Sequence, residues 1–269
     1  MDTKYWLGVC NKIGESAFEE MKKHFENIES KKVVGNGSGG DKTMIVDDAI
    51  EKILLKEIEK TGKSVKIISE EFGEKTIGNK PEILMVVDPL DGSNNFKFGI
   101  PFNCISIAVG GLSEKIEDTE IGYVKDFVKG DTYHAIKGKG AWKNDKKIFT
   151  NKEDTNCLFV DVVLKNEKDF RRIVNVGKKF PYVRMLGSAC LAMCFAAEGI
   201  IDGYIILGAG RTIDFTATQL IVKEAGGIVK DLDGKDLTDY DIGFEIKINL
   251  IAASNETKFR KIKSVLVVE

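Results

Sequence analysis

Residues 83–96 read ILMVVDPLDGSNNF, an apolar run followed at once by acidic, hydroxyl and amide side chains. The apolar part is short and rich in branched residues, which predicts a buried strand. Pro89 fixes its own φ angle and Gly92 can adopt dihedral angles that other residues avoid, so we expect a tight turn after the strand. Asp88 and Asp91 are therefore predicted to converge at the end of a rigid strand.

The two carboxylates of this segment are suited to hold a metal ion. Neighbouring carboxylates repel each other unless a cation lies between them, and hard oxygen ligands suit Mg²⁺ or Mn²⁺. The backbone N–H groups of Gly92, Ser93 and Asn94 are expected to form a small nest for anionic oxygens. The pattern D-x-x-D-G is also common in ordinary turns, and its spacing differs from that of a calcium-binding EF-hand loop. On this segment alone, a metal site beside a phosphate and a plain turn remain alternatives.

Further acidic residues stand at the ends of other predicted elements. Glu70 and Glu71 follow a second strand-like run at 65–69, and carboxylate chemistry does not distinguish between them. Asp214 opens a strongly helical segment, where it is also a good helix N-cap. Asp47 lies shortly after a glycine-rich loop.

Two long motifs relate these segments to a known family. Residues 88–96 match D-P-[IL]-D-G-[TS]-x-N-F, and residues 214–227, which end in EAGG, match a second motif. With GSA at 187–189, they make the chain similar to the inositol monophosphatase and fructose-1,6-bisphosphatase superfamily of metal-dependent, lithium-sensitive phosphatases. The resemblance extends from Asp41 to residue 254. It implies a layered αβαβα sugar-phosphatase fold, of mixed α+β and α/β class.

Apolar periodicity divides the chain into two halves. We expect an N-terminal α+β subdomain at 1–150 with an antiparallel sheet and most metal ligands, and a C-terminal α/β subdomain at 151–269 with Asp214 and the substrate-side residues. Residues 138–155 are expected to form a surface connection. The first half is predicted to contain helices at 5–25 and 44–59 and strands at 65–69, 83–88, 102–110, 120–126 and 132–136. The second is predicted to contain strands at 157–163, 182–186, 202–207, 227–230 and 248–253 and helices at 167–178, 188–199, 214–225 and 255–266.

The resemblance also implies a set of metal ligands. Asp88 would bridge two ions, Asp91 and Asp214 would complete one site, and family alignment favours Glu70 over Glu71 for the other. The carbonyl of Leu90 is a further expected ligand. Two or three Mg²⁺ ions per active site are implied, with Mn²⁺ as an alternative.

The implied chemistry is a direct in-line attack of water on a phosphate monoester, without a phosphoenzyme. Ser93 would orient the water and help to deprotonate it, Asp47 would pair with Ser93, and Glu70 would also take part in catalysis. The residues expected to bind phosphate or substrate are Asp91, Gly92, Ser93, Asn94, Gly187, Ser188, Arg184, Leu207 and Arg211.

Substrate choice depends on a few positions. Leu207 stands where animal inositol monophosphatases have a glutamate that binds inositol hydroxyls, and leucine cannot accept hydrogen bonds. Arg211 could instead bind a second phosphate or a sugar hydroxyl, with Arg184 and Lys165 as weaker candidates. Fructose 1,6-bisphosphate and inositol 1-phosphate are the expected substrates. The alternatives are adenosine 3′,5′-bisphosphate and a non-catalytic regulator that binds metal or sugar phosphate.

The loop at 35–43 superficially satisfies two nucleotide-binding patterns. It contains G-x-G-x-x-G and misses a P-loop by one inserted residue, but each motif needs a buried strand immediately before it. The inserted Asp41 would also place negative charge where a phosphate must lie. The resemblance implies instead a mobile loop, including Gly40, Asp41 and Lys42, that closes over the metal site.

Composition agrees with such an enzyme without selecting it. The 269 residues carry 40 Lys and Arg against 42 Asp and Glu, a net charge of −2, so nucleic acid and membrane partners are not expected. No signal-like leader or membrane-spanning run is apparent, which predicts a cytoplasmic protein. Its five cysteines are expected to be reduced, although a bridge between Cys157 and Cys194 remains an alternative. The resemblance implies a homodimer.

Overall fold

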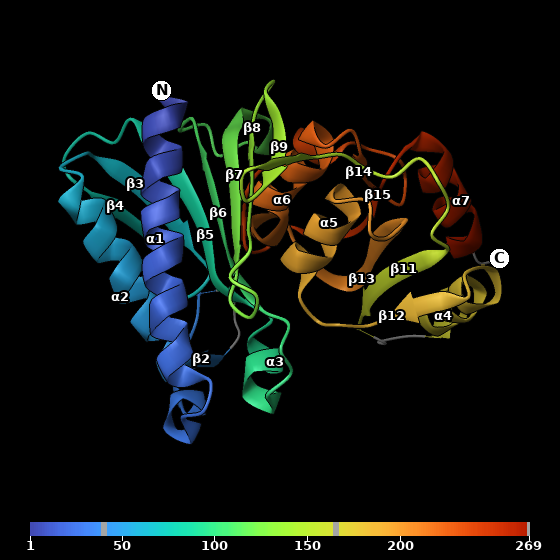
Figure 1. The fold of residues 1–269 in the computed structure, drawn as a ribbon, viewed down its shortest axis with the longest axis horizontal. Helices are drawn as coiled ribbons and strands as arrows, with labels where there is room; N and C mark the ends of the chain where they lie inside the picture. The colour runs from blue at the N-terminus through green and yellow to red at the C-terminus, as the bar shows by residue number, and fades with distance from the viewer. Residues whose placement is uncertain (39–41, 164–166, 268–269) are drawn as a thin grey trace.

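Five layers of secondary structure alternate between helices and sheets in a computed structural model that describes residues 1–38, 42–163 and 167–267 (Figure 1). A helix pair covers the outer face of an eight-stranded sheet, a second pair lies between this sheet and a five-stranded sheet, and a third pair covers the far face. The expected αβαβα fold is thereby confirmed. The helices are α1 (Thr3–His24), α2 (Ile45–Lys60), α3 (Ser93–Phe98), α4 (Glu167–Lys179), α5 (Ala189–Ala197), α6 (Thr212–Glu224) and α7 (Glu256–Leu266).

The outer helices form because their apolar residues recur at helical spacing. In α1, Trp6, Val9, Ile13, Ala17 and Met21 are all buried, three or four residues apart. This stripe and the matching face of α2 pack in one cluster with the eight-stranded sheet.

The eight-stranded sheet is antiparallel except where β3 and β5 run parallel. Its order is β10-β9-β8-β7-β6-β5-β3-β4, and a separate two-stranded sheet pairs β1 (Val33–Asn36) with β2 (Lys42–Met44). The strands of the large sheet are β3 (Val65–Ser69), β4 (Gly73–Ile77), β5 (Ile83–Asp91), β6 (Cys104–Gly110), β7 (Thr119–Asp126), β8 (Thr132–Ile136), β9 (Gly140–Lys143) and β10 (Lys146–Ile148).

The strands β9 and β10 correct the expectation of a mere surface connection at 138–155. They form a hairpin in which Lys143 pairs with Lys146, so the loop between them has two residues. Asn144, the first loop residue, has φ 53°, a value that asparagine tolerates and that two-residue hairpin turns require.

The five-stranded sheet is mixed rather than purely parallel. Its order is β12-β11-β13-β15-β14, with β11 parallel to both β12 and β13 and with β15 antiparallel to both neighbours. Helices α5 and α6 pack on one face, and α4 and α7 on the other. The strands are β11 (Cys157–Val162), β12 (Tyr182–Arg184), β13 (Gly203–Arg211), β14 (Ile228–Asp231) and β15 (Lys247–Ala253).

Strand β5 runs past its expected end and carries a bulge. Asp88 pairs with Ser106 and Asp91 with Cys104, so one extra residue of β5 is accommodated between them. Gly92 follows with φ 88°, and a Cβ at this position would lie 2.8 Å from the carbonyl oxygen of Phe102. The bulge and this glycine together turn the chain from the sheet into α3.

Two further expectations are decided by the fold. All five cysteines lie among the described residues and all are free, so the bridge between Cys157 and Cys194 is not formed. Cys157 begins β11, whereas Cys194 is buried inside α5. Within the described ranges, no helix has the length and apolar character needed to span a bilayer.

Candidate active site

A cleft of about 380 Å³ opens where the end of β5 faces the ends of β11 and β13. It brings together side chains from both halves of the sequence. Its lining includes many of the predicted site residues, namely Glu70, Asp88, Leu90, Asp91, Gly92, Ser93, Asn94, Gly187, Arg211 and Asp214.

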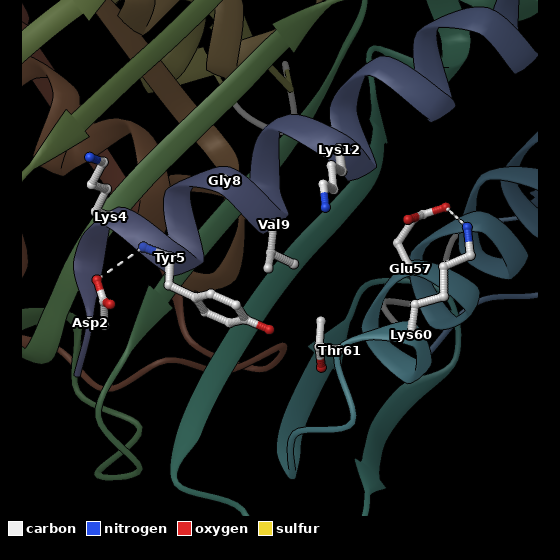
Figure 2. A pocket seen from close by; sticks show the side chains of 9 residues that line it. All are labelled: Asp2, Lys4, Tyr5, Gly8, Val9, Lys12, Glu57, Lys60 and Thr61. Atoms are coloured by element: carbon white, nitrogen blue, oxygen red, sulfur yellow. Dashed lines mark hydrogen bonds and ion pairs between the residues drawn. The ribbon is translucent and has the colours of Figure 1, made fainter.

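A larger hollow of about 530 Å³ lies elsewhere, between α1 and α2. Figure 2 shows the ring of Tyr5 extending into it, with Lys60 bound to Glu57 at 2.6 Å on its far wall. Its lining contains two acidic residues, Asp2 and Glu57, and none of the predicted site residues. The smaller cleft is therefore the candidate active site.

Glu70 and Glu71 have different surroundings in the structure. Glu70 lines the cleft, whereas Glu71 accepts a hydrogen bond from the hydroxyl of Thr43 in β2. Of the two, only Glu70 belongs to the group of carboxylates that converges with Asp88 and Asp214 among the described residues.

The carboxylates of Glu70, Asp88 and Asp214 form the centre of the cleft. One oxygen of each lies within 4.8 Å of the others. Burial, together with the charge of Asp214, raises the pKa of Glu70 to about 8. Burial and the charge of Glu70 also raise the pKa of Asp88 well above its usual range. Such shifts mean that the cluster needs positive charge to stay ionised.

Arg211 supplies part of that charge within the protein. Its guanidinium is bound to Glu70 and lies 3.1 Å from Oδ1 of Asp214. The three side chains are between 11% and 14% exposed, so the contact is shielded from water. Arg211, expected to bind substrate, thus contacts two predicted metal ligands.

Asp214 is not the N-cap of its helix, contrary to one expectation. Helix α6 begins at Thr212 with Arg211 as its N-cap, and Asp214 is the third helical residue. Its Oδ2 accepts the backbone N–H of Arg211 at 3.1 Å. This contact satisfies a donor at the helix start and orients the carboxylate toward the cleft.

Asp91 lies beside this cluster but is held from behind by the start of α5. Its carboxylate accepts hydrogen bonds from the hydroxyl of Ser188 and from the backbone N–H groups of Ala189 and Cys190, the latter two at 3.2 and 2.8 Å. Burial raises the pKa of Asp91 to about 6, although these contacts oppose the rise. Ser188, predicted to contact substrate, is fully buried and contacts Asp91 instead.

Asp47 is buried at the start of α2 and does not line the cleft. Its Oδ2 accepts the N–H of Met44 at 2.6 Å, and Oδ1 has no hydrogen-bond partner in the part of the chain that the structure describes. Burial raises the pKa of Asp47 to about 7, with the charge of Glu71 adding to the rise. No hydrogen bond joins Asp47 to Ser93 among the described residues, so the predicted pair is not assembled.

The substrate-facing position predicted for Leu207 is wrong. Its side chain is fully buried in the cluster that faces α4 and α7, because successive residues of a strand point to opposite faces of the sheet. Ile206 and Tyr204, on the other face of β13, line the cleft in its place.

The remaining predicted residues lie around the cleft or outside the described ranges. Arg184 ends β12, is exposed and donates to the carbonyl of Val183 at 2.9 Å rather than lining the cleft. Lys42 is exposed at the start of β2. Gly40, Asp41 and Lys165 lie outside the described residues.

Sequence reasoning missed Asp161, which lines the cleft from the end of β11. Its carboxylate accepts the N–H of Gly187 at 3.1 Å and the hydroxyl of Tyr204 at 2.9 Å. Burial raises the pKa of Asp161. The available signal was an acidic residue near the end of an otherwise apolar strand-like run, the same signal that singled out Asp88.

The donor set fits divalent cations that prefer oxygen. Three carboxylates converge, no histidine lines the cleft among the described residues, and burial together with neighbouring carboxylate charge raises the pKa values of Glu70 and Asp88. Hard oxygen ligands of this kind suit Mg²⁺ or Mn²⁺ rather than softer metals.

Comparison with known proteins identifies the family. A sequence model described as the inositol monophosphatase family matches residues 3–265. The fructose-1,6-bisphosphatase/inositol-1-monophosphatase of Methanothermobacter thermautotrophicus is 32% identical to this chain, over 99% of the chain and 98% of that protein. A bifunctional NADP phosphatase/NAD kinase of Methanococcus maripaludis is 34% identical over 87% of this chain, which matches 44% of its length.

A solved structure leads to the same assignment. It is described as a hypothetical protein from Pyrococcus horikoshii with similarities to inositol-1 monophosphatase, and it superposes with a TM-score of 0.83 at 28% identity, covering 100% of both chains. The fold, the converging carboxylates and the match over nearly the whole sequence agree. The chain belongs to the inositol monophosphatase family and is a phosphatase of that family.

Proposed function

We propose that the protein hydrolyses phosphate monoesters of sugars and polyols, with fructose 1,6-bisphosphate and inositol 1-phosphate as substrates and Mg²⁺ as the metal. The observation that carries this proposal is the convergence of Glu70, Asp88 and Asp214 from three distant segments, with Asp91 beside them. The names of relatives such as the Methanothermobacter protein support the choice of substrates.

The metal-holding residues of this proposal are Glu70, Asp88, Asp91 and Asp214, with the carbonyl of Leu90. Bound divalent cations would supply charge to neutralise the phosphoryl oxygens and would lower the pKa of the attacking water. Arg211 already contacts Glu70 and Asp214, so cation binding requires its guanidinium to give up at least part of that contact.

The protein's own contribution to the reaction is to orient the water and the phosphate. Ser93 follows the β5 turn at the mouth of the cleft, where its hydroxyl can hold the attacking water in line with the ester bond. The Oδ1 of Asp47, which has no hydrogen-bond partner among the described residues, is the acceptor that would take up the hydroxyl of Ser93. Backbone N–H groups of Gly92, Ser93 and Asn94 would hold the phosphate oxygens.

Several finer properties belong to the same proposal. The family resemblance supports a homodimer, inhibition by lithium, a cytoplasmic location and a division into subdomains at about residue 150. Exposed apolar side chains near α3, including Phe98 at 70% and Ile100 at 44% exposure, provide a surface that a second copy would cover.

Phosphate release from both substrates, with and without Mg²⁺, tests the function. Mutating a residue that only hydrogen-bonds to a metal ligand typically lowers activity roughly 10–100-fold. Asp214 is itself a proposed ligand, so Asp214→Asn should lower kcat/KM by more than this. Asp231→Asn is the matched control, since Asp231 lies in β14 outside the cleft lining. Turnover of adenosine 3′,5′-bisphosphate alone would move the assignment to that substrate, and no turnover of any of the three would refute the proposal.

A further inference from the structure

Asp161 is held in a fixed position on the wall of the cleft that β11 and β13 form. One carboxylate oxygen accepts the N–H of Gly187 at 3.1 Å, and the other accepts the hydroxyl of Tyr204 at 2.9 Å. Tyr204 is fully buried, so its hydroxyl cannot turn to water without leaving the core. Donors from β13 and from the segment before α5 therefore fix the carboxylate on two sides.

The carboxylate keeps acceptor capacity for a bound molecule. An ionised carboxylate has about four acceptor positions, and the contacts with Gly187 and Tyr204 occupy two of them. The neighbouring side chains on this wall, Val163 and Ile206, are apolar and cannot accept hydrogen bonds. Asp161 is therefore placed to accept hydrogen bonds from hydroxyl groups that enter this side of the cleft.

The charges of the described cleft residues disfavour the binding of a second phosphate beside Asp161. Among the described residues that line the cleft, Arg211 is the single cationic side chain, and it is bound to Glu70 and Asp214. An anionic group placed beside Asp161 would face a fixed negative charge in a partly buried setting, where repulsion is stronger than in water. A neutral polyol would meet no such repulsion.

We propose that Asp161 is a specificity-determining residue, which accepts hydrogen bonds from polyol hydroxyls and disfavours a second phosphate. The preferred substrate class is then the monophosphate ester of a neutral polyol or sugar, and of the two proposed substrates inositol 1-phosphate is favoured. This inference rests on the proposed phosphatase function. It assigns Tyr204 as a positioning residue, because Tyr204 acts on the substrate only through Asp161.

Asp161→Asn tests the proposal, because it removes the charge while nearly keeping the shape. The full-length protein with Mg²⁺ is assayed on inositol 1-phosphate and on fructose 1,6-bisphosphate. We expect the ratio of kcat/KM values to move toward the bisphosphate by about tenfold or more, corresponding to the loss of one charge-assisted hydrogen bond. The change should arise mainly in KM.

Asp231→Asn is the matched control, because Asp231 also binds backbone N–H groups and a tyrosine hydroxyl, that of Tyr240, but outside the cleft. It should leave the ratio unchanged. A ratio in Asp161→Asn within twofold of the wild type, or an equal shift in Asp231→Asn, would overturn the inference.

If Asp161→Asn fails to fold, Tyr204→Phe provides a second test of the role of Asp161, because it removes the hydroxyl that holds the carboxylate. It should raise KM for inositol 1-phosphate and leave kcat unchanged, whereas a purely structural role would lower the yield of active enzyme without moving KM. An unchanged KM would overturn the inference. If the wild type hydrolyses both substrates, an unchanged ratio in Asp161→Asn or an unchanged KM in Tyr204→Phe refutes the role of Asp161 and leaves the proposed phosphatase function standing. If the wild type hydrolyses neither, the proposed function fails first and the inference falls with it.

Discussion

Replacing Arg211 by glutamine should destabilise the metal-free protein far more than the metal-bound one. In the structure the guanidinium neutralises Glu70 and Asp214, and all three side chains are nearly buried. Removing one partner of a buried ion pair typically costs about 3–5 kcal/mol, because the remaining charge is left uncompensated. Protonation of Glu70, whose pKa is already raised to about 8, limits the loss to the lower end, about 3 kcal/mol.

Thermal unfolding measures this cost directly. For a chain of this size, 1 kcal/mol shifts Tm by about 2–4 °C, so the variant should melt about 6–12 °C below the wild type in EDTA. With saturating Mg²⁺ the difference should shrink, because the cations take over the charge that Arg211 supplied. Without a competing guanidinium, the variant should also bind Mg²⁺ more tightly, which isothermal titration calorimetry would show.

Arg172→Gln provides the matched control. Arg172 is 16% exposed and contacts Asp169 at 3.1 Å, in α4 on the far side of the five-stranded sheet from the cleft-lining face. Its substitution should lower Tm equally with and without Mg²⁺. If Arg211→Gln behaves in the same way, with no difference between EDTA and Mg²⁺, Arg211 does not stand in for the cation and the reasoning is refuted.

Three other expectations follow from the same contacts. In EDTA the wild type should lose stability as pH rises from about 4.5 to about 8, because the folded-state pKa of Glu70 lies above its unfolded value, and Mg²⁺ should abolish this slope in thermal melts. Glu70→Gln should lower kcat/KM for phosphate release by more than about 100-fold, whereas Glu71→Gln, at a residue that contacts Thr43 and does not line the cleft, should stay within about tenfold; the reverse order would exchange their roles. Gly92→Ala should cost about 1–3 kcal/mol in denaturant unfolding, because φ 88° and the 2.8 Å approach to the Phe102 carbonyl both oppose a side chain, and a cost below about 0.5 kcal/mol would contradict this.

Most of the fold was predictable because its elements carry strong local periodicity. The stripe in α1 and the apolar run of β5 bury continuous faces, and their positions agree with the expectation to within a few residues. The hairpin of β9 and β10 was missed because its strands have four and three residues, too few to show a period-two pattern, and because β10 is an exposed, lysine-rich edge strand.

The site residues that belong to local sequence motifs could be predicted. Contacts between side chains that are far apart in the sequence could not. Asp88, Asp91 and Asp214 could be found from their motifs, and the structure brings all three to one cleft. The partner of Arg211 could not be foreseen, because Glu70 is 141 residues away and only the packing of α6 against the large sheet joins them. The hydrogen bond from Ser188 to Asp91 could not be foreseen for the same reason, since the two residues are 97 positions apart.

Leu207 was assigned to the substrate side by its distance along the chain from Asp214, and an irregularity in β13 makes such a distance unreliable. Between Ile206 and Gly210, β13 advances four residues while its partner β15 advances two, and Gly208 has φ 83° within that segment. The two residues of β13 that have no counterpart on β15 interrupt the regular ladder, so a fixed count back from Asp214 does not identify the position that faces the cleft. The face that reaches the cleft therefore presents Ile206 and Tyr204, which are apolar or bound to Asp161. Since neither of these two side chains offers a free carboxylate, the acidic acceptor for substrate hydroxyls on this side is Asp161 of the neighbouring strand β11.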